Sequence, residues 1–447
     1  MKKILSVLLI ISGILAILSA QENLSLYEKN WPEWRGPYAN GTAPAGNPPI
    51  AWSESSNVKW KVEIPGKGHA TPIVWEDQII LLSAVQTEEK VETEEPAGDQ
   101  DQNSWMKPVA TNYIHKFVVV SVNRHDGKIR WQTTVREDLP HGSTHEFGSW
   151  ASNSPVTDGE HIYAYFGSKG LYCLDMDGAI IWERDFGTME KVMSFGEGSS
   201  PVLHKDKLII LRDHEGQSTL HIMDKNTGKE LLKIDREEPS SWATPLIVEH
   251  DGKTQVITGA TNKIRSYDLA DGRIIWECGG LTRNVIPSPV SHDNMVYLMS
   301  GYRGNALLAI DLSRAKGDIT GTDAIIWRSD LNTPYAPSPV LMDGRLFFLK
   351  LNNGFLSCRD AADGKEYYSI QKLDSIQNIF ASPVGVMDRI YIPGANGFFY
   401  TVKAGNEFDV LSLNRLDDQF HASPAIKGDN LYLRGFNYLY CIAEEQD

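Results

Sequence analysis

A recurring Ser-Pro or Thr-Pro step constrains the fold more than any other feature of this 447-residue sequence. Each step opens a short apolar run, and the eight prolines are Pro72, Pro155, Pro201, Pro245, Pro289, Pro339, Pro383 and Pro424. Successive prolines are 41 to 50 residues apart, except for a first interval of 83 residues. A period of this length fits four short strands, which make one blade of a β-propeller. Eight steps therefore predict a ring of eight blades.

Residues 264–277 show the internal pattern of one repeat. Two apolar runs flank the turn Ala270-Asp271-Gly272, and Asp before Gly between such runs is a strong hairpin signal. A hairpin cannot bury its apolar face alone, so the copies must stack on one another. The sequence thus predicts an all-β chain of four-stranded antiparallel blades. Several fourth strands carry a Trp, which we expect to wedge between neighbouring blades; these are Trp131, Trp182, Trp276 and Trp327.

The last repeat has only three strand-like runs, so its fourth strand must come from elsewhere. An isolated run at residues 58–64 precedes the first Pro marker and carries Trp60 where other fourth strands carry their Trp. We predict that this N-terminal strand closes the last blade, which hides two sheet edges at once. The propeller then spans residues 57–447.

The N-terminal 56 residues lie outside the repeat pattern. Residues 1–20 have a positive start, a short apolar run and a small-residue end, which predicts a cleavable signal peptide. We therefore expect an exported protein, periplasmic or extracellular. No Cys precedes Cys173, so it is not expected to be a lipoprotein at the predicted cleavage site. Residues 21–56 are predicted to form an irregular arm, disordered to about residue 30, whose aromatic residues dock on the outside of the ring.

Composition narrows the classes of partner. The formal net charge is -15, so nucleic acid and anionic membrane surfaces are excluded as partners by bulk electrostatics. The four Cys residues are far apart in sequence, and three share a third-strand position, which favours buried thiols over disulfides. The long first interval is explained by an acidic insertion at residues 86–107, predicted to be a solvated loop.

The loops that enter the first strand of each blade should meet at one end of the central channel. Their aromatic and polar side chains would suit a small polar or planar ligand, and the predicted rim residues are His69, Trp150, Glu197, Trp242, Asn284, Tyr335, Asn378, Phe380 and His421.

Two clusters of titratable residues are expected on the same rim. The first includes His145 and Glu146, and the second includes Asp213 and His214. Together they could hold a metal such as zinc, whose catalytic sites use three such ligands and an open position. An equal alternative is that these residues act as a general acid and base without a metal. The remaining alternative is that they are solvated loop side chains with no chemical role.

At the level of the repeat, the chain resembles the pyrroloquinoline-quinone (PQQ)-like β-propeller repeat family. The resemblance rests on a third-strand Asp, a Gly turn and a Trp, seen at residues 175–182, 268–276 and 311–327. It implies an eight-bladed ring. The family includes quinoprotein dehydrogenases and the BamB-type non-catalytic propeller of the bacterial β-barrel assembly machinery.

The dehydrogenase branch implies a quinone stacked between a Trp and a disulfide of adjacent cysteines, with calcium nearby. By that resemblance Trp242 would be the stacking floor, Glu197 and Asn284 would offer oxygen ligands, and Asp213 would be the acidic residue. The sequence has no adjacent Cys pair.

The sequence therefore favours a binding or scaffold module that acts through the channel rim. Its expected partner is a cell-envelope protein, a glycan or a small polar ligand. The alternative is an enzyme with its site on the same rim, either a PQQ-dependent dehydrogenase with calcium or a carbohydrate-active enzyme.

Overall fold

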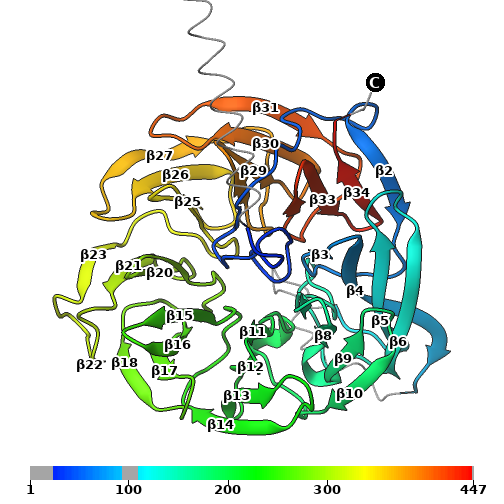
Figure 1. Cartoon of the computed structure of the whole chain (residues 1–447), viewed down its shortest axis with the longest axis horizontal. Coiled ribbons are helices and arrows are strands. Elements are labelled where there is room, and N and C mark those ends of the chain that lie inside the picture. The colour runs from blue at the N-terminus through cyan, green and yellow to red at the C-terminus, as the bar shows by residue number, and fades with distance from the viewer. Residues whose placement is uncertain (1–23, 93–108, 445–447) are drawn as a thin grey trace, which may run out of the picture.

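The computed structural model describes residues 24–92 and 109–444, which form eight β-sheets arranged in a ring (Figure 1). Each sheet has four antiparallel strands in sequential order, and the first strands of neighbouring sheets contact one another around the central channel. The predicted eight-bladed, all-β propeller is therefore confirmed. The helical segments among the described residues are two short 3-10 turns, η1 (Gly167–Lys169) and η2 (Val192–Ser194).

The first four blades follow the chain directly. From the channel outwards, their strands are β3 (Ile73–Trp75), β4 (Gln78–Lys90), β5 (Tyr113–Asn123) and β6 (Ile129–Asp138); β7 (Val156–Thr157), β8 (His161–Tyr165), β9 (Leu171–Asp175) and β10 (Ile180–Arg184); β11 (Val202–His204), β12 (Lys207–Arg212), β13 (Ser218–Asp224) and β14 (Glu230–Arg236); and β15 (Leu246–His250), β16 (Lys253–Thr258), β17 (Ile264–Asp268) and β18 (Ile274–Cys278).

The last four blades follow the same order, and the eighth takes its outer strand from the N-terminal region. Their strands are β19 (Val290–His292), β20 (Met295–Ser300), β21 (Ala306–Asp311) and β23 (Ile325–Ser329); β24 (Val340–Met342), β25 (Arg345–Leu349), β26 (Phe355–Asp360) and β27 (Glu366–Lys372); β28 (Val384–Val386), β29 (Arg389–Pro393), β30 (Phe398–Lys403) and β31 (Val410–Arg415); and β32 (Ala425–Lys427), β33 (Asn430–Arg434), β34 (Tyr438–Ile442) and β2 (Val58–Glu63). Two short parallel strands extend two of the sheets: β1 (Thr42–Ala43) pairs with the innermost strand β28, and β22 (Gly317–Asp318) pairs with the outermost strand β18.

Burial explains the composition of the strands. The second strand β12 is buried along almost its whole length between two blades, and its sequence is largely Leu and Ile. The outer strand β23 alternates between half-buried and exposed positions, as expected for a strand with one face in water. The core of the protein is therefore divided among the interfaces between blades.

The predicted closure of the ring is confirmed. Strand β2 pairs antiparallel with β34, with Trp60 opposite Cys441 and Glu63 opposite Tyr438 (Figure 1). The N-terminal and C-terminal parts of the chain thus share one sheet.

The Ser-Pro and Thr-Pro steps also link neighbouring blades through hydrogen bonds. The residue before each of the first seven prolines donates its backbone N–H to the side-chain hydroxyl of the matching residue in the next blade, at 2.8–3.2 Å. The series of bonds runs through Thr71, Ser154, Ser200, Thr244, Ser288, Ser338, Ser382 and Ser423. These seven bonds tie eight blades together around the channel. The series is open between blades eight and one, where the Thr71 hydroxyl has no partner among the described residues.

Fourth-strand Trp residues join neighbouring blades, as predicted. Trp182 of blade two donates its indole N–H to the Lys225 carbonyl of blade three, at 3.1 Å. Its ring covers the turn glycine Gly228, where an added Cβ would lie 2.6 Å from the indole. Trp60, Trp131 and Trp327 make equivalent bonds across three other blade boundaries. Trp276 departs from this pattern and bonds the Gln255 side chain of its own blade.

The expected position and disorder of the arm are wrong. Trp31 is fully buried and pairs with Val74 in the first strand of blade one. The Arg35 guanidinium donates to the carbonyls of Pro339 and Pro383, both at 2.6 Å, at the inner edge of blades six and seven. The arm therefore crosses the middle of the ring rather than its outside (Figure 1). Residues 24–30 form hydrogen-bonded turns.

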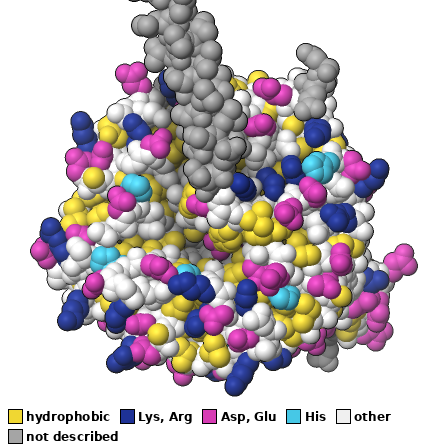
Figure 2. Space-filling model, in the orientation of Figure 1, with side chains coloured by type: hydrophobic (Ala, Val, Ile, Leu, Met, Phe, Trp, Pro, Cys, Tyr) yellow, Lys and Arg dark blue, Asp and Glu magenta, His cyan; other side chains and the backbone are white. Residues whose placement is uncertain are grey.

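The structure agrees with some of the remaining predictions about the chain, and others fall on residues that it does not describe. All four Cys side chains are buried and free, as expected. Residues 86–90 of the predicted acidic loop continue strand β4, and residues 93–108 lie outside the described residues, as does the predicted signal peptide. No helix in residues 24–92 and 109–444 has the length and apolar character of a membrane span. Figure 2 shows acidic and basic side chains interspersed on one face, so neither sign forms a continuous patch there.

Candidate functional site

The central channel holds a cavity of about 680 Å³ at the end where the chain enters the first strands. We call it the channel mouth. Its lining comes from the loops before the first strands and from loops after the second strands, such as residues 301–303 and 351–353. Trp34 from the arm lines its inner end and donates its indole N–H to the Ser288 hydroxyl at 3.1 Å. The arm thus puts a floor across the channel.

Aromatic rings form one wall of the channel mouth. The Phe147 and Phe380 ring centres are 5.0 Å apart, and the His421 ring lies 4.9 Å from Phe380. His69 stacks on Phe436 at 5.0 Å and meets His421 edge to face at the same distance. Offset and edge-to-face contacts at this range are favourable, so they fix the wall in one arrangement.

The opposite wall is also aromatic. Tyr302 and Tyr335 stack with ring centres 5.0 Å apart. Trp242 donates its indole N–H to the Gly196 carbonyl at 2.8 Å, and the Lys191 ammonium lies 5.1 Å from its ring centre. Burial raises the pKa of Tyr335 to about 12, so the phenol is neutral at physiological pH. This wall offers flat apolar faces edged by hydroxyl and amide groups.

The imidazoles of the channel mouth are held neutral. Burial lowers the pKa of His421 to about 4, and it lowers the pKa of His69 well below the usual value. Nδ1 of His421 lies 2.9 Å from the Phe147 carbonyl, so in the neutral ring this nitrogen carries the proton and donates it. Nε2 of His69 is buried without a hydrogen-bond partner among the described residues. An unpaired nitrogen of this kind is available to a ligand.

Two carboxylate side chains line the channel mouth, and only one of them is held by hydrogen bonds. Glu197 is half-buried and accepts from the backbone N–H of Ser168 at 2.6 Å and from the Ser168 hydroxyl. Burial raises the pKa of Glu197. Glu146 is exposed beside His145, whose pKa is lowered by burial. Glu197 is therefore held in the scaffold, and Glu146 faces water.

The cavity brings together most of the predicted rim residues. Those that line it are His69, Glu197, Trp242, Tyr335, Asn378, Phe380 and His421, together with the candidates His145 and Glu146. Trp150 lies beside a neighbouring cavity of about 240 Å³ and packs edge to face on His115. Asn284 is not among the residues that line the channel mouth; its side chain lowers the pKa of Tyr335 by less than burial raises it.

The second candidate cluster lies away from the channel mouth. Asp213 forms a fully buried ion pair with Arg236, with oxygen-to-nitrogen distances of 2.7 and 3.0 Å, and accepts from the Ser241 hydroxyl at 2.8 Å. Nδ1 of His214 accepts backbone N–H groups from Glu190 and Gly216. Both side chains are thus engaged in holding loops.

The two clusters do not converge into the metal site that the sequence suggested. Among the residues that the structure describes, one group of three His, Asp or Glu side chains is close enough to share an ion: Asp158, Glu160 and His161. Asp158 already pairs with Lys225 at 2.6 Å.

Several residues of the channel mouth were not predicted. Phe147 comes from the loop that carries His145 and Glu146, Phe195 from the loop that carries Glu197, and Tyr302 follows a second strand. Trp34 comes from the arm, and no periodic pattern marks its position. The aromatic residues next to the predicted histidines were a usable signal, because an exposed loop seldom concentrates Phe and His without burying them.

The sequence of the repeats identifies the family. The family model for the outer membrane protein assembly factor BamB matches residues 115–369, more than half of the chain. This chain belongs to the BamB family. Among its relatives, BamB of Yersinia pestis is 20% identical over 333 residues, which cover 71% of this chain and 78% of that protein.

Solved structures of BamB and of quinoproteins share the fold. BamB of Moraxella catarrhalis superposes with a TM-score of 0.54 at 16% identity, covering 81% of this chain and 99% of its own. A europium-containing methanol dehydrogenase gives 0.63 at 11% identity, covering 95% and 92%. The quinohemoprotein alcohol dehydrogenase of Comamonas testosteroni gives 0.61 at 9% identity, covering 97% and 84%. At these identities the likeness shows a common fold.

The side chains of this BamB-family channel do not fit the quinone site that the dehydrogenase branch implies. The four cysteines are free, buried and on different blades, so no disulfide faces Trp242. The Glu197 oxygens are occupied by Ser168, and Asp213 is paired with Arg236. Both acidic residues that the resemblance assigned to this site are therefore already engaged by other side chains.

Proposed function

We propose that this chain is a binding module of the cell envelope that receives an apolar, aromatic segment of a partner protein in the channel mouth. The observation that carries the proposal is the aromatic-walled cavity of about 680 Å³, which is large enough for a few side chains. Membership of the BamB family supports a protein partner, because the relatives are named as assembly factors of outer membrane proteins.

The chemistry of the cavity favours binding over catalysis. Phe147, Phe380 and Trp242 offer flat rings that suit an apolar side chain, and recognition sites of proteins are rich in such rings. The unpaired Nε2 of His69 would accept a hydrogen bond from the inserted segment. A glycosidase needs a pair of free carboxyl groups, and here Glu197 is held by Ser168.

Export to the periplasm or beyond is part of the proposal. It rests on the predicted signal peptide at residues 1–20 and on the named role of the relatives at the outer membrane.

Photo-cross-linking in living cells tests the proposal. The photoreactive amino acid p-benzoylphenylalanine replaces Phe380 in the channel mouth or, as the matched control, Ile181 on the outer strand β10, which is 48% exposed. We expect a discrete cross-linked protein from position 380 and none from position 181. Equal products from both positions, or none from position 380, would contradict a site in the channel mouth.

The enzymatic alternative has its own test. Purified protein is titrated with PQQ and calcium while its absorption spectrum is recorded. We expect no saturable spectral change, because no Trp and disulfide pair is present among the described residues to hold the quinone. Stoichiometric uptake, with alcohol oxidation by the loaded protein, would replace the binding module by a quinoprotein.

A further inference from the structure

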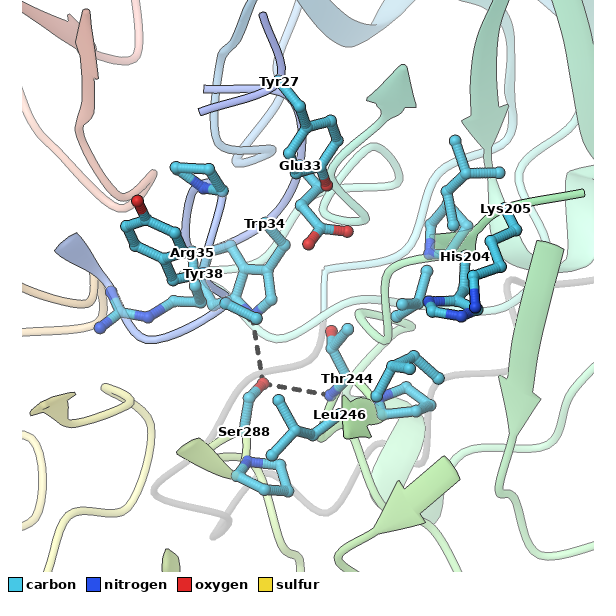
Figure 3. Close-up of a pocket in the computed structure, with 18 of the residues that line it drawn as sticks. Tyr27, Glu33, Trp34, Arg35, Tyr38, His204, Lys205, Thr244, Leu246 and Ser288 are labelled. Carbon is cyan, nitrogen blue, oxygen red and sulfur yellow. Dashed lines mark hydrogen bonds between the residues drawn. The ribbon is translucent and has the colours of Figure 1, made fainter. Parts of the chain in front are cut away.

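A second cavity, of about 500 Å³, lies on the other side of the Trp34 floor. We call it the arm-side cavity. Its first wall is the arm, with Tyr27, Glu33 and Trp34, and its second wall is made by the first strands of blades three to five and the turns that follow them (Figure 3). Thr244 and Ser288 line both this cavity and the channel mouth.

Glu33 is the unusual residue of the arm-side cavity. Its side chain points into the cavity in Figure 3, although the residue is only 8% exposed. Burial raises its pKa to about 8, and no cation among the described residues offsets this effect. The neighbouring Tyr27 hydroxyl lowers the pKa of Glu33 by less than burial raises it. Burying an ionised carboxylate without a counter-ion is costly, so Glu33 keeps its proton at neutral pH, and a cation bound beside it would favour the ionised form.

The other charged groups of the cavity already have partners. Asp158 pairs with Lys225 at 2.6 Å, and Glu249 pairs with Lys205 at 2.8 Å. The Arg35 guanidinium is bound to the Pro339 and Pro383 carbonyls. Among the acidic side chains that line this cavity, Glu33 is therefore the one without a basic partner in the described structure.

The rest of the lining suits a carbon skeleton with hydrogen-bonding ends. Apolar contact comes from the residues Trp34, Pro201, Pro245, Leu246 and Pro289. Nε2 of His204 is buried without a hydrogen-bond partner, 3.5 Å from the Glu249 carboxylate. Two polar groups with unused capacity, Glu33 and His204, thus face one apolar cavity.

We propose that the arm-side cavity binds a primary ammonium group on a short apolar skeleton, with Glu33 as its counter-ion. A metal ion is a poor fit, because calcium and magnesium need several oxygen ligands and Glu33 offers the one free carboxylate. The volume is in the range of small-molecule sites, and the Pro and Leu side chains would cover the skeleton. The ammonium site is independent of the function proposed for the channel mouth.

Calorimetric titration with benzylammonium chloride tests this site. The full chain is titrated at pH 7.5, beside the variants Glu33→Gln and Glu366→Gln. The first replacement keeps the shape of the side chain and removes its charge, whereas Glu366 is an exposed carboxylate outside the cavity that pairs with Arg359. We expect saturable binding to the parent protein, a loss of at least tenfold in affinity for Glu33→Gln, and a change of less than twofold for Glu366→Gln. Benzyl alcohol, the uncharged counterpart, should bind parent and Glu33→Gln equally weakly.

Two further measurements complete the test. Nα-acetyl-lysine N-methylamide carries the same ammonium on a peptide unit, so tighter binding of this probe assigns the site to a Lys side chain of a polypeptide, and tighter binding of benzylammonium assigns it to a free amine. Circular dichroism checks that Glu33→Gln is folded. No saturable binding of either probe to the parent protein, or equal affinity in a folded Glu33→Gln variant, overturns the proposal.

Discussion

At the scale of single residues, Glu33 makes the stability of the fold depend on pH. Its pKa is about 8 in the folded protein against 4.5 in an exposed chain, so between these values the folded state keeps a proton that the unfolded state has lost. The free energy of unfolding must therefore fall as pH rises through this window. The fall is complete above the folded pKa.

The variant Glu33→Gln should remove this decline. Relative to the parent protein, we expect it to be similar at pH 5 and more stable at pH 9 by on the order of a few kcal/mol. Urea unfolding followed by Trp fluorescence at pH 5, 7 and 9 measures the difference. The control Glu249→Gln changes an exposed carboxyl and should show no such trend; a pH-independent difference for Glu33→Gln would contradict the buried charge.

The side-chain hydroxyls of the residues that precede the repeated prolines should contribute unequally to the free energy of unfolding. Ser338→Ala leaves the buried N–H of Ser288 without its acceptor, which costs about 1–3 kcal/mol. Thr71→Val removes a buried hydroxyl that accepts no bond, so we expect a change within about 0.5 kcal/mol or a small gain. Chemical unfolding of both variants measures the contrast. Equal losses would show that the bonds between blades contribute nothing specific.

At the scale of the strands and turns, the Trp of one blade and the Gly of the next form a repeated joint. Gly228 has φ of +63°, and its added Cβ would lie 2.6 Å from the Trp182 ring. The replacement Gly228→Ala therefore adds a steric clash to the strain of a positive φ.

We expect Gly228→Ala to lower the free energy of unfolding by about 2–4 kcal/mol. Gly252 is the matched control, because its φ is +72° and nothing lies within 4 Å of its added Cβ. Gly252→Ala should cost about 1 kcal/mol. Thermal and urea unfolding of the two variants measure both values, and equal costs would mean that the Trp can move away from the joint without penalty.

The repeated elements could be predicted because each is decided by local chemistry. The Ser-Pro steps, the Asp-Gly turn at residues 271–272 and the Trp of each fourth strand recur at one spacing, and they predict eight blades and the closing strand β2. The channel-mouth residues followed from the same marker, since loops entering the first strands must converge at one end of the channel.

The contacts that could not be predicted join residues that are far apart in the sequence. Arg35 reaches carbonyls more than 300 positions away, and no pattern around residues 31–37 indicates that destination. Asp213 resembled a candidate for catalysis in the sequence, but Arg236 at the end of β14, two strands away in the same sheet, pairs with it. Asn284 has φ of +55° and is not among the residues that line the channel mouth. A linear sequence does not reveal such pairings.

At the scale of the whole molecule, the arm connects the N-terminal region to blades six and seven through Arg35. Arg35→Met should free this connection, because two buried charge-assisted hydrogen bonds are lost. We expect amide hydrogen exchange in residues 31–39 to become at least tenfold faster, with the blades unchanged. The control Arg303→Met alters an exposed Arg at the channel mouth and should leave the arm protected; unchanged exchange in Arg35→Met would mean that Trp31 and its neighbours hold the arm alone.

We expect a segment of a partner protein to enter the aromatic channel mouth of the closed eight-bladed ring. The direct measurement is a calorimetric titration of the segment captured from position 380 against the parent protein and two double variants. Phe147→Ala with Phe380→Ala removes one wall of the mouth, and Ile181→Ala with Ile274→Ala alters two exposed positions on the outer strands. We expect the channel variant to bind at least tenfold more weakly and the outer variant to stay within twofold of the parent protein. The reverse order, or equal affinities in all three proteins, would contradict the claim.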